Sequence, residues 1–318
     1  MAGTTAASHR NPRLLRRRRA RAWSAQMAEG EFQDAALVII GHGSSSNAGS
    51  SGAVRLHAEA LRARRIFREV REAFWKQAPF LADVARSISA PRIFFIPLFI
   101  SDGWFTEHVI PTALGLLEPG DEGFPRVVER CGQTWLYGRA VGSHPAMTEV
   151  LLARARGVLE RHPFPRAPGP SETALVVVGH GTANSTGSRE SVEREVHSIR
   201  SRALYAEVQP AFLEESPRVQ DCFGLTTARN LVVVPFFMSD GLHVQEDIPV
   251  MLGEAEADVK ERISAGRPTW RNPTQRRGRR VWCAPAIGTE PLLSDVILER
   301  VREAEPNSQI GRQGLLRA

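Results

Sequence analysis

The sequence predicts an α/β protein made of two homologous, doubly wound parallel-sheet domains with a cleft between them. The segment Ala36–Gly43 (ALVIIGHG) recurs 138 residues later as Ala174–Gly181 (ALVVVGHG), and Ile93–Gly103 recurs at the same offset as Leu231–Gly241. Several matches at one spacing indicate an internal duplication. The repeated apolar runs are rich in Val, Ile and Leu, as are strands of a parallel sheet that helices cover on both faces.

The second half shows the order of elements most clearly. Its apolar runs and helical spacings predict alternating strands and helices, in the order strand Leu175–Val178, helix Ser191–Val208, strand Tyr205–Leu213, helix Arg218–Ala228, strand Asn230–Met238 and a helix that opens near Asp247. Strands that alternate with helices favour parallel pairing, because each helix carries the chain back to the starting edge of the sheet.

The length of 318 residues is enough for two domains, each with its own core. The proline-rich segment Arg161–Glu172 (RHPFPRAPGPSE) lies between the repeats and is typical of a linker. We therefore expect the following division of the chain: a disordered Arg-rich extension at 1–33, an N-terminal domain at 34–160, a linker at 161–173, a C-terminal domain at 174–305 and a tail at 306–318.

The positive charge of the chain is concentrated at its N-terminus. Seven arginines and no acidic residue precede Met27, which is itself a candidate start, so the remainder of the chain has a net charge of about −1. A nucleic acid is therefore not the expected partner. No apolar run is long enough for a membrane span, and the three cysteines form no CxxC pair. The pattern favours a cytoplasmic protein without a disulfide framework or a cysteine metal centre.

Candidate functional residues follow the strands of the second half. His180 lies between two glycines after the first strand, Glu214 and Glu215 end the second, and His243 follows the third. Ligands of open parallel sheets bind beyond the carboxyl ends of the strands, where such loops converge. We therefore expect two imidazoles and a carboxylate at one edge of the sheet, whereas Glu215 is expected to face solvent.

Three motifs of the second half together resemble the class II chelatases of the CbiX and SirB type, which act on sirohydrochlorin. The motifs are ALVVVGHGT at Ala174–Thr182, AFLEESP at Ala211–Pro217 and PFFMSDGLHVQEDIP at Pro235–Pro249, and the resemblance extends over about residues 36–302. It implies two chelatase-like domains in a duplicated form of this family. It also implies that one chain, as a fused pseudo-dimer, works as a monomer or forms a homodimer.

The resemblance implies roles for the three residues. His180, His243 and Glu214 would be catalytic, with the imidazoles holding the incoming metal or accepting pyrrole protons, and the carboxylate assisting proton removal. The partners would be a sirohydrochlorin-type tetrapyrrole and a divalent metal as substrate, Co²⁺ first, or Fe²⁺ or Ni²⁺, with no organic cofactor. Neutral imidazole suits all three ions. Cobalt insertion would serve cobalamin synthesis and iron insertion sirohaem synthesis.

The first half is a degenerate copy of this site. It keeps His42 as the counterpart of His180, but Lys76 and Phe105 replace the carboxylate and the second imidazole. Two further candidates are weaker. His108 would need a shifted loop to act as a displaced ligand, and Asp247 is expected to cap the next helix rather than to serve the site.

Two alternatives to a chelatase can be weighed from the sequence. The altered first half allows a tetrapyrrole or metal carrier that keeps the fold without turnover. A hydrolase using His180 or Ser44 is disfavoured, because no GxSxG elbow or Ser-His-Asp arrangement is visible. Basic side chains that could contact the carboxylates of sirohydrochlorin are Lys76, Arg189 and Arg194.

Overall fold

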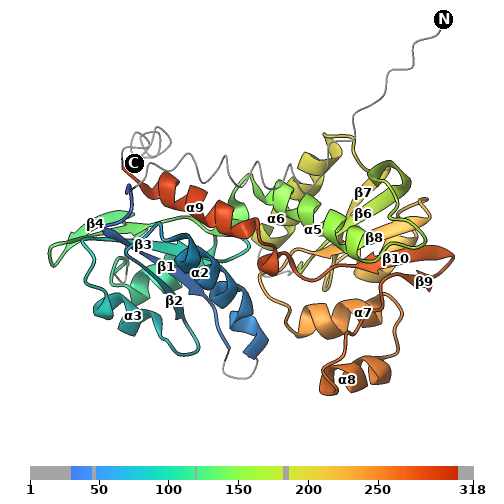
Figure 1. The fold of residues 1–318 in the computed structure, drawn as a ribbon, viewed down its shortest axis with the longest axis horizontal. Coiled ribbons are helices and arrows are strands. Elements are labelled where there is room, and N and C mark those ends of the chain that lie inside the picture. Colours follow the sequence, from blue (N-terminus) through green and yellow to red (C-terminus); the bar gives the residue numbers. More distant parts are fainter. Residues whose placement is uncertain (1–29, 45–47, 119, 182–185, 307–318) are drawn as a thin grey trace, which may run out of the picture.

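Two five-stranded sheets form the centre of the molecule, one in each half of the chain (Figure 1). The computed structural model describes residues 30–44, 48–118, 120–181 and 186–306. Most of the predicted N-terminal extension, with Met27, and nearly all of the predicted tail therefore lie outside the described residues, whereas Phe32 at the end of that extension is buried in the core. The predicted domain boundaries stay a prediction. Among the described residues, no helix has the length and apolar character needed to cross a membrane.

The two sheets have the same topology. The strand order is β2-β1-β3-β5-β4 in the first sheet and β7-β6-β8-β10-β9 in the second. The strands are β1 (Ala35–Gly41), β2 (Glu69–Phe74), β3 (Arg92–Pro97), β4 (Val127–Arg130), β5 (Gln133–Tyr137), β6 (Thr173–Gly179), β7 (Glu207–Phe212), β8 (Asn230–Pro235), β9 (Thr274–Arg276) and β10 (Arg279–Cys283). Four strands of each sheet are parallel, which confirms the predicted fold class, whereas β4 and β9 are antiparallel edge strands that the sequence did not reveal.

Helices cover both faces of each sheet. The first half contains η1 (Ala48–Ser51), α2 (Gly52–Arg64), α3 (Leu81–Ser87), the π-helix η2 (Phe105–Val109), α4 (Ile110–Ala113), η3 (Val141–Ser143) and α5 (Met147–Arg161). The second half contains η4 (Pro170–Glu172), α6 (Thr186–Arg200), η5 (Val219–Phe223), the π-helix η6 (His243–Asp247), α7 (Ile248–Met251), α8 (Glu256–Ser264), η7 (Ile287–Thr289) and α9 (Leu293–Ala304).

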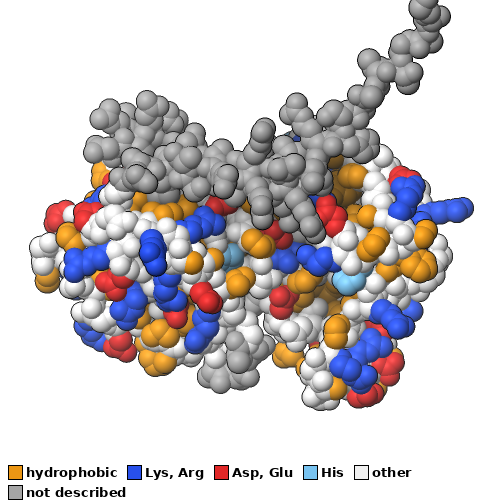
Figure 2. Space-filling model, in the orientation of Figure 1, with side chains coloured by type: hydrophobic (Ala, Val, Ile, Leu, Met, Phe, Trp, Pro, Cys, Tyr) orange, Lys and Arg blue, Asp and Glu red, His pale blue; other side chains and the backbone are white. Residues whose placement is uncertain are grey.

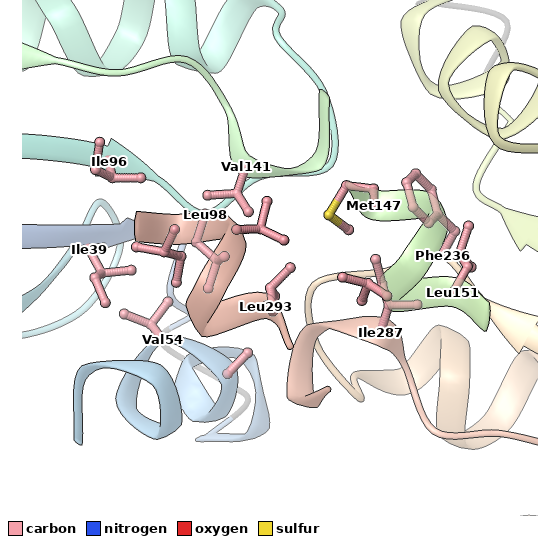
Figure 3. Close-up of a cluster of buried hydrophobic side chains, with 14 of the residues drawn as sticks. Ile39, Val54, Ile96, Leu98, Val141, Met147, Leu151, Phe236, Ile287 and Leu293 are labelled. Carbon is pink, nitrogen blue, oxygen red and sulfur yellow. The ribbon is translucent and has the colours of Figure 1, made fainter. Parts of the chain in front are cut away.

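The last helix of each half packs on the sheet of the other half. In Figure 1, α9 lies over the first sheet and α5 over the second, and the contacts of α9 with β3 and of α5 with β8 agree. Figure 3 shows Leu293 of α9 beside Leu98, and Met147 and Leu151 of α5 beside Phe236. Burying such side chains contributes about 1.5–3 kcal/mol each. This exchange of α5 and α9 between the halves joins both halves in one hydrophobic core.

Two buried polar contacts join the two halves of the chain. The imidazole of His57 in α2 lies 2.8 Å from Ser294 Oγ and 2.7 Å from the carbonyl oxygen of Gly288. At the corresponding place in the other half, Thr148 Oγ1 lies 2.6 Å from the carboxylate of Glu195 in α6. The contacts pack α2 against η7 and the start of α9, and the start of α5 against α6.

Two predicted helices are shorter than the sequence suggested. The helix predicted at Ser191–Val208 ends at Arg200, because Ala203 takes a left-handed conformation (φ 48°) that a helix does not tolerate. The helix predicted at Arg218–Ala228 is only the short 3-10 helix η5. The backbone N–H groups of Thr227 and Ala228, which would lie at the end of the predicted helix, instead donate hydrogen bonds to the carboxylate of Glu207.

The boundaries around the third strand also differ from the prediction. Strand β8 ends at Pro235 rather than Met238. The helical segment predicted to open near Asp247 begins at His243, as the π-helix η6 that continues into α7. His243 therefore occupies the first turn of a helix and not a loop.

Candidate functional site

Two glycines place His180 at the carboxyl edge of the second sheet. A Cβ atom on Gly179 would lie 2.4 Å from Val192 Cγ2, so the close passage of α6 requires glycine there. Gly181 has a φ of 63°, and its Cβ would lie 2.7 Å from Phe212 Cβ. Only glycine combines this left-handed conformation with such a close approach. The chain therefore turns sharply on both sides of the imidazole.

The structure brings the three predicted site residues together. The ring centroids of His180 and His243 are 4.9 Å apart and the rings are nearly perpendicular, at 86°. Glu214 Oε1 lies 3.7 Å from His180 Nδ1. All three side chains are between one third and about half exposed, so a ligand can reach them. Their proximity is observed, whereas their roles in metal binding and proton transfer stay predictions.

Asp247 contacts His243 and does not cap a helix. Its Oδ2 lies 2.6 Å from His243 Nδ1, and its side chain makes no hydrogen bond to the backbone N–H groups of α7. Because η6 runs directly into α7, that helix has no free N-terminus at this point, and the capping interpretation is wrong. A carboxylate on Nδ1 favours the tautomer that leaves Nε2 free to bind a metal.

Among the described residues, the candidate metal ligands form an incomplete coordination site. Within the described part of the chain, no three His, Cys, Asp or Glu side chains are arranged as a ready metal-binding group. His180 Nδ1 is buried and has no hydrogen-bond partner. The arrangement thus offers two imidazoles with a carboxylate near each, so it suits a metal that binds briefly more than one that stays.

The basic residues predicted to contact the substrate differ in their availability. Arg189 is engaged, with its guanidinium 2.9 Å from Glu215 and 2.8 Å from Glu193. Glu215 is consequently half-buried, and the expectation that it faces solvent is wrong. Arg194 is half exposed and lies 3.9 Å from Glu195, while Lys76 is exposed at the carboxyl edge of the first half.

The corresponding edge of the first half has the same geometry with different side chains. The ring centroid of His42 lies 4.8 Å from that of Phe105, which occupies the place of the second imidazole. His108 stacks on Trp104 at 4.2 Å, and among the described residues no ring contact joins it to His42. The structure therefore does not bring His108 into the position of a displaced ligand.

A pocket of about 1000 Å³ lies on the other side of η6 from the three site residues. Val244 and Gln245 line it, together with Trp270 and the end of α5, and none of the three site residues takes part. Figure 2 shows a recess between the surfaces over α5 and α8, with basic side chains around it. The pocket is thus separate from the site, and the cleft predicted between the halves stays a prediction.

The chain matches one protein-family model twice. The model of the CbiX family covers residues 36–158 and 174–304. A relative in Halobacterium salinarum, named probable sirohydrochlorin cobaltochelatase, is 38% identical over 85% of this chain and 91% of its own length. A chloroplastic sirohydrochlorin ferrochelatase of Arabidopsis thaliana is 32% identical over 40% of this chain and 51% of its own length.

Solved structures agree in fold. A multi-domain protein of Deinococcus radiodurans with structural similarity to chelatases aligns at a TM-score of 0.69 and 26% identity, over 86% of this chain but only 56% of that one. SirB from Bacillus subtilis with Fe³⁺ aligns at 0.60 and 17% identity, over 86% of this chain and 97% of that one, which supports the fold alone. On the double match of its two halves, the chain belongs to the CbiX family.

Proposed function

We propose that the chain is a sirohydrochlorin chelatase that inserts a divalent metal, Co²⁺ in the first place or Fe²⁺, into the tetrapyrrole. The observation that carries this proposal is the pair His180 and His243, whose rings lie 4.9 Å apart beside two carboxylates at the carboxyl edge of the second sheet. Membership of the CbiX family and the names of the relatives support it.

The imidazoles would hold the incoming metal. With Nδ1 of His243 donating to Asp247, the lone pair on Nε2 is available to a divalent ion. His180 provides the second nitrogen from the neighbouring loop. Two neutral nitrogen ligands bind Co²⁺ or Fe²⁺ loosely enough for the four nitrogens of the macrocycle to take over.

Glu214 would assist proton removal. Insertion of a divalent ion into the free macrocycle forms four metal–nitrogen bonds and releases two protons from its pyrrole N–H groups. The carboxylate of Glu214 is exposed and 3.7 Å from His180, so it can accept a proton and pass it to solvent or to the imidazole. Lys76, on the facing half, would pair with a carboxylate of the substrate.

Cobalt is proposed first because the relative named as a cobaltochelatase matches 85% of this chain, whereas the ferrochelatase matches 40%. The donor types themselves do not decide, since imidazole and carboxylate also accept Fe²⁺ and Ni²⁺. We further propose that one chain is the working unit. The exchange of α5 and α9 within the chain supports this, because each half already covers the sheet of the other. A homodimer and a cytoplasmic location stay expectations from the sequence.

The proposal is tested by following metal insertion through the absorbance of the tetrapyrrole. Purified protein is mixed anaerobically with sirohydrochlorin and Co²⁺, Fe²⁺ or Ni²⁺ in turn, beside protein-free controls, His243→Ala and the remote surface variant Leu204→Ala. We expect acceleration by the wild type, fastest with Co²⁺, at least about 100-fold less in His243→Ala and unchanged in Leu204→Ala. Tight tetrapyrrole binding without acceleration by folded protein would instead support the carrier.

A further inference from the structure

We propose that the carboxyl edge of the first half is a stacking platform for the flat tetrapyrrole macrocycle. The platform consists of Trp75, Phe99 and Phe105, and we call it the aromatic platform. The inference rests on the proposed function, because it takes sirohydrochlorin as the ligand. It assigns a purpose to the half that has lost two of the three site residues.

Phe105 is the centre of the aromatic platform. Its ring stacks on Phe99 with centroids 5.8 Å apart and planes at 20°, and the Trp75 ring stands at 84° with its centroid 6.3 Å away. His42 packs on Phe105 from the end of β1. These side chains come from segments that follow β1, β2 and β3, so their rings cluster at the carboxyl edge of the first sheet.

The aromatic platform is partly accessible to a ligand. Trp75 is 39% exposed, whereas Phe99 and Phe105 are partly buried against the core of the first half. The neighbouring Trp104, outside the platform, is 70% exposed and stacks on His108. Large aromatic side chains are mostly buried, and a group of exposed ones marks a surface that binds something. A planar conjugated ligand is the partner that aromatic faces suit best.

The comparison with the second half supports the same conclusion. At the positions of Trp75 and Trp104 the second half has Leu213 and Leu242, and at the position of Phe105 it has His243. The first half has thus lost metal ligands and gained aromatic surface at the same edge. Loss of function alone would remove the ligands, but it gives no reason for the added rings.

The aromatic platform occupies the place in the first half that His180 and His243 occupy in the second. The contacts of His57 with Ser294 and of Thr148 with Glu195 join the two halves. Lys76 follows Trp75 directly and is exposed, so a cation adjoins the platform. A macrocycle with carboxylates around its rim would find an apolar face and a counter-ion together.

The test measures binding without metal. Sirohydrochlorin is titrated into the full-length wild type, Trp75→Leu, Phe105→Leu and the control Leu204→Ala, and the absorbance of the tetrapyrrole gives Kd. Leucine keeps the site apolar, and thermal unfolding verifies that each variant is folded. Trp75→Phe, which restores a ring, serves as the rescue. The same variants are then assayed for Co²⁺ binding and for KM and kcat of metal insertion.

We expect Kd and KM to rise about tenfold in Trp75→Leu and Phe105→Leu, in line with the loss of one aromatic stacking partner. Co²⁺ binding and kcat should change less than about twofold, and Trp75→Phe should recover most of the affinity. An unchanged Kd in both leucine variants would overturn the aromatic platform while leaving the chelatase intact. Ring-dependent binding by a wild type that inserts no metal would support the platform and reject the chelatase.

Discussion

The two carboxyl edges of the molecule have nearly the same backbone and different chemistry. In the second half the imidazoles of His180 and His243 lie 4.9 Å apart, and in the first half His42 and Phe105 lie 4.8 Å apart. A π-helix follows the third strand in both halves. The backbone therefore places equivalent side chains at both edges, and imidazoles occupy both positions in the second half but one in the first.

A second difference lies behind the π-helices. Beside the second sheet is the pocket of about 1000 Å³, whose lining includes Cys283. At the matching place in the first half, the Tyr137 hydroxyl donates a hydrogen bond to the carbonyl oxygen of Thr106 at 2.7 Å, and the Arg126 guanidinium lies over the Tyr137 ring. The first half thus has the larger Tyr137 side chain where the second has Cys283. The two halves therefore differ on both sides of the π-helix that follows the third strand.

The largest expected effect is a difference in kcat between variants of His180 and His42, which occupy equivalent positions in the two halves. His180→Ala should lower the kcat of metal insertion at least about 100-fold, because it removes one of two metal ligands. His42→Ala should leave kcat within about twofold, since Phe105 beside it binds no metal, although KM can rise. Steady-state kinetics with sirohydrochlorin and Co²⁺ measure both. Equal losses of kcat would show that both halves take part in catalysis.

Asp247 offers a test with a smaller effect. In Asp247→Asn the partner of His243 Nδ1 loses its charge, which weakens the preference for the metal-binding tautomer, and kcat should fall about 10- to 100-fold. Asp258→Asn, on the exposed surface of α8, is the control. A kcat equal to that of the wild type in Asp247→Asn would mean that the contact has no role in orientation.

The exchange of helices requires a tight turn after the last parallel strand of each half. A Cβ atom on Gly288 would lie 2.0 Å from the carbonyl oxygen of Met238, and one on Gly142 would lie 2.2 Å from that of Ile100. Gly288→Ala should therefore lower the free energy of unfolding by about 3 kcal/mol or more. Gly52→Ala, where a Cβ meets nothing, should change it by less than about 1 kcal/mol. Denaturant unfolding compares them, and equal stabilities would contradict the close packing.

The contributions of His57 and Glu195, which join the two halves, to the free energy of unfolding should depend on pH in opposite directions. Burial lowers the pKa of His57 from 6.5 to about 4, so its contribution to stability is complete above pH 6.5 and is lost as pH falls toward 4. The shift corresponds to about 3 kcal/mol. Burial raises the pKa of Glu195, so its contribution is complete at low pH and is lost as pH rises through the raised pKa.

Urea unfolding at pH 7 and pH 5 checks this prediction in the wild type, His57→Gln and Glu195→Gln. Relative to the wild type, His57→Gln should lose less stability on acidification and Glu195→Gln should lose more. If His57→Gln has the same pH dependence as the wild type, the buried neutral imidazole is not the source of the effect.

The sequence predicted the sheets and the site because both are local or repeated patterns. The apolar runs that end in Gly-His-Gly fix strands β1 and β6, and residues that follow parallel strands meet at one edge whatever the rest of the fold. For the same reason the proximity of His180, Glu214 and His243 was predictable from their places after three strands.

Other features depend on contacts that no sequence pattern encodes. The spacing of His243 and Asp247 fits a helix cap as well as an ion pair, and only the continuity of η6 with α7 excludes the cap. The exchange of α5 and α9 is invisible because an amphipathic helix does not specify which sheet it covers. The signal available for the aromatic platform was the presence of Trp75 opposite Leu213 and of Phe105 opposite His243.

The most direct test of the account is the number of metal ions per chain. Titration of Co²⁺ into the wild type, His180→Ala and His42→Ala, followed by calorimetry or visible absorbance, counts the sites. We predict one weakly bound ion per chain, lost in His180→Ala and retained in His42→Ala. Two equivalent ions in the wild type, or an ion that survives His180→Ala and is lost in His42→Ala, would contradict the account.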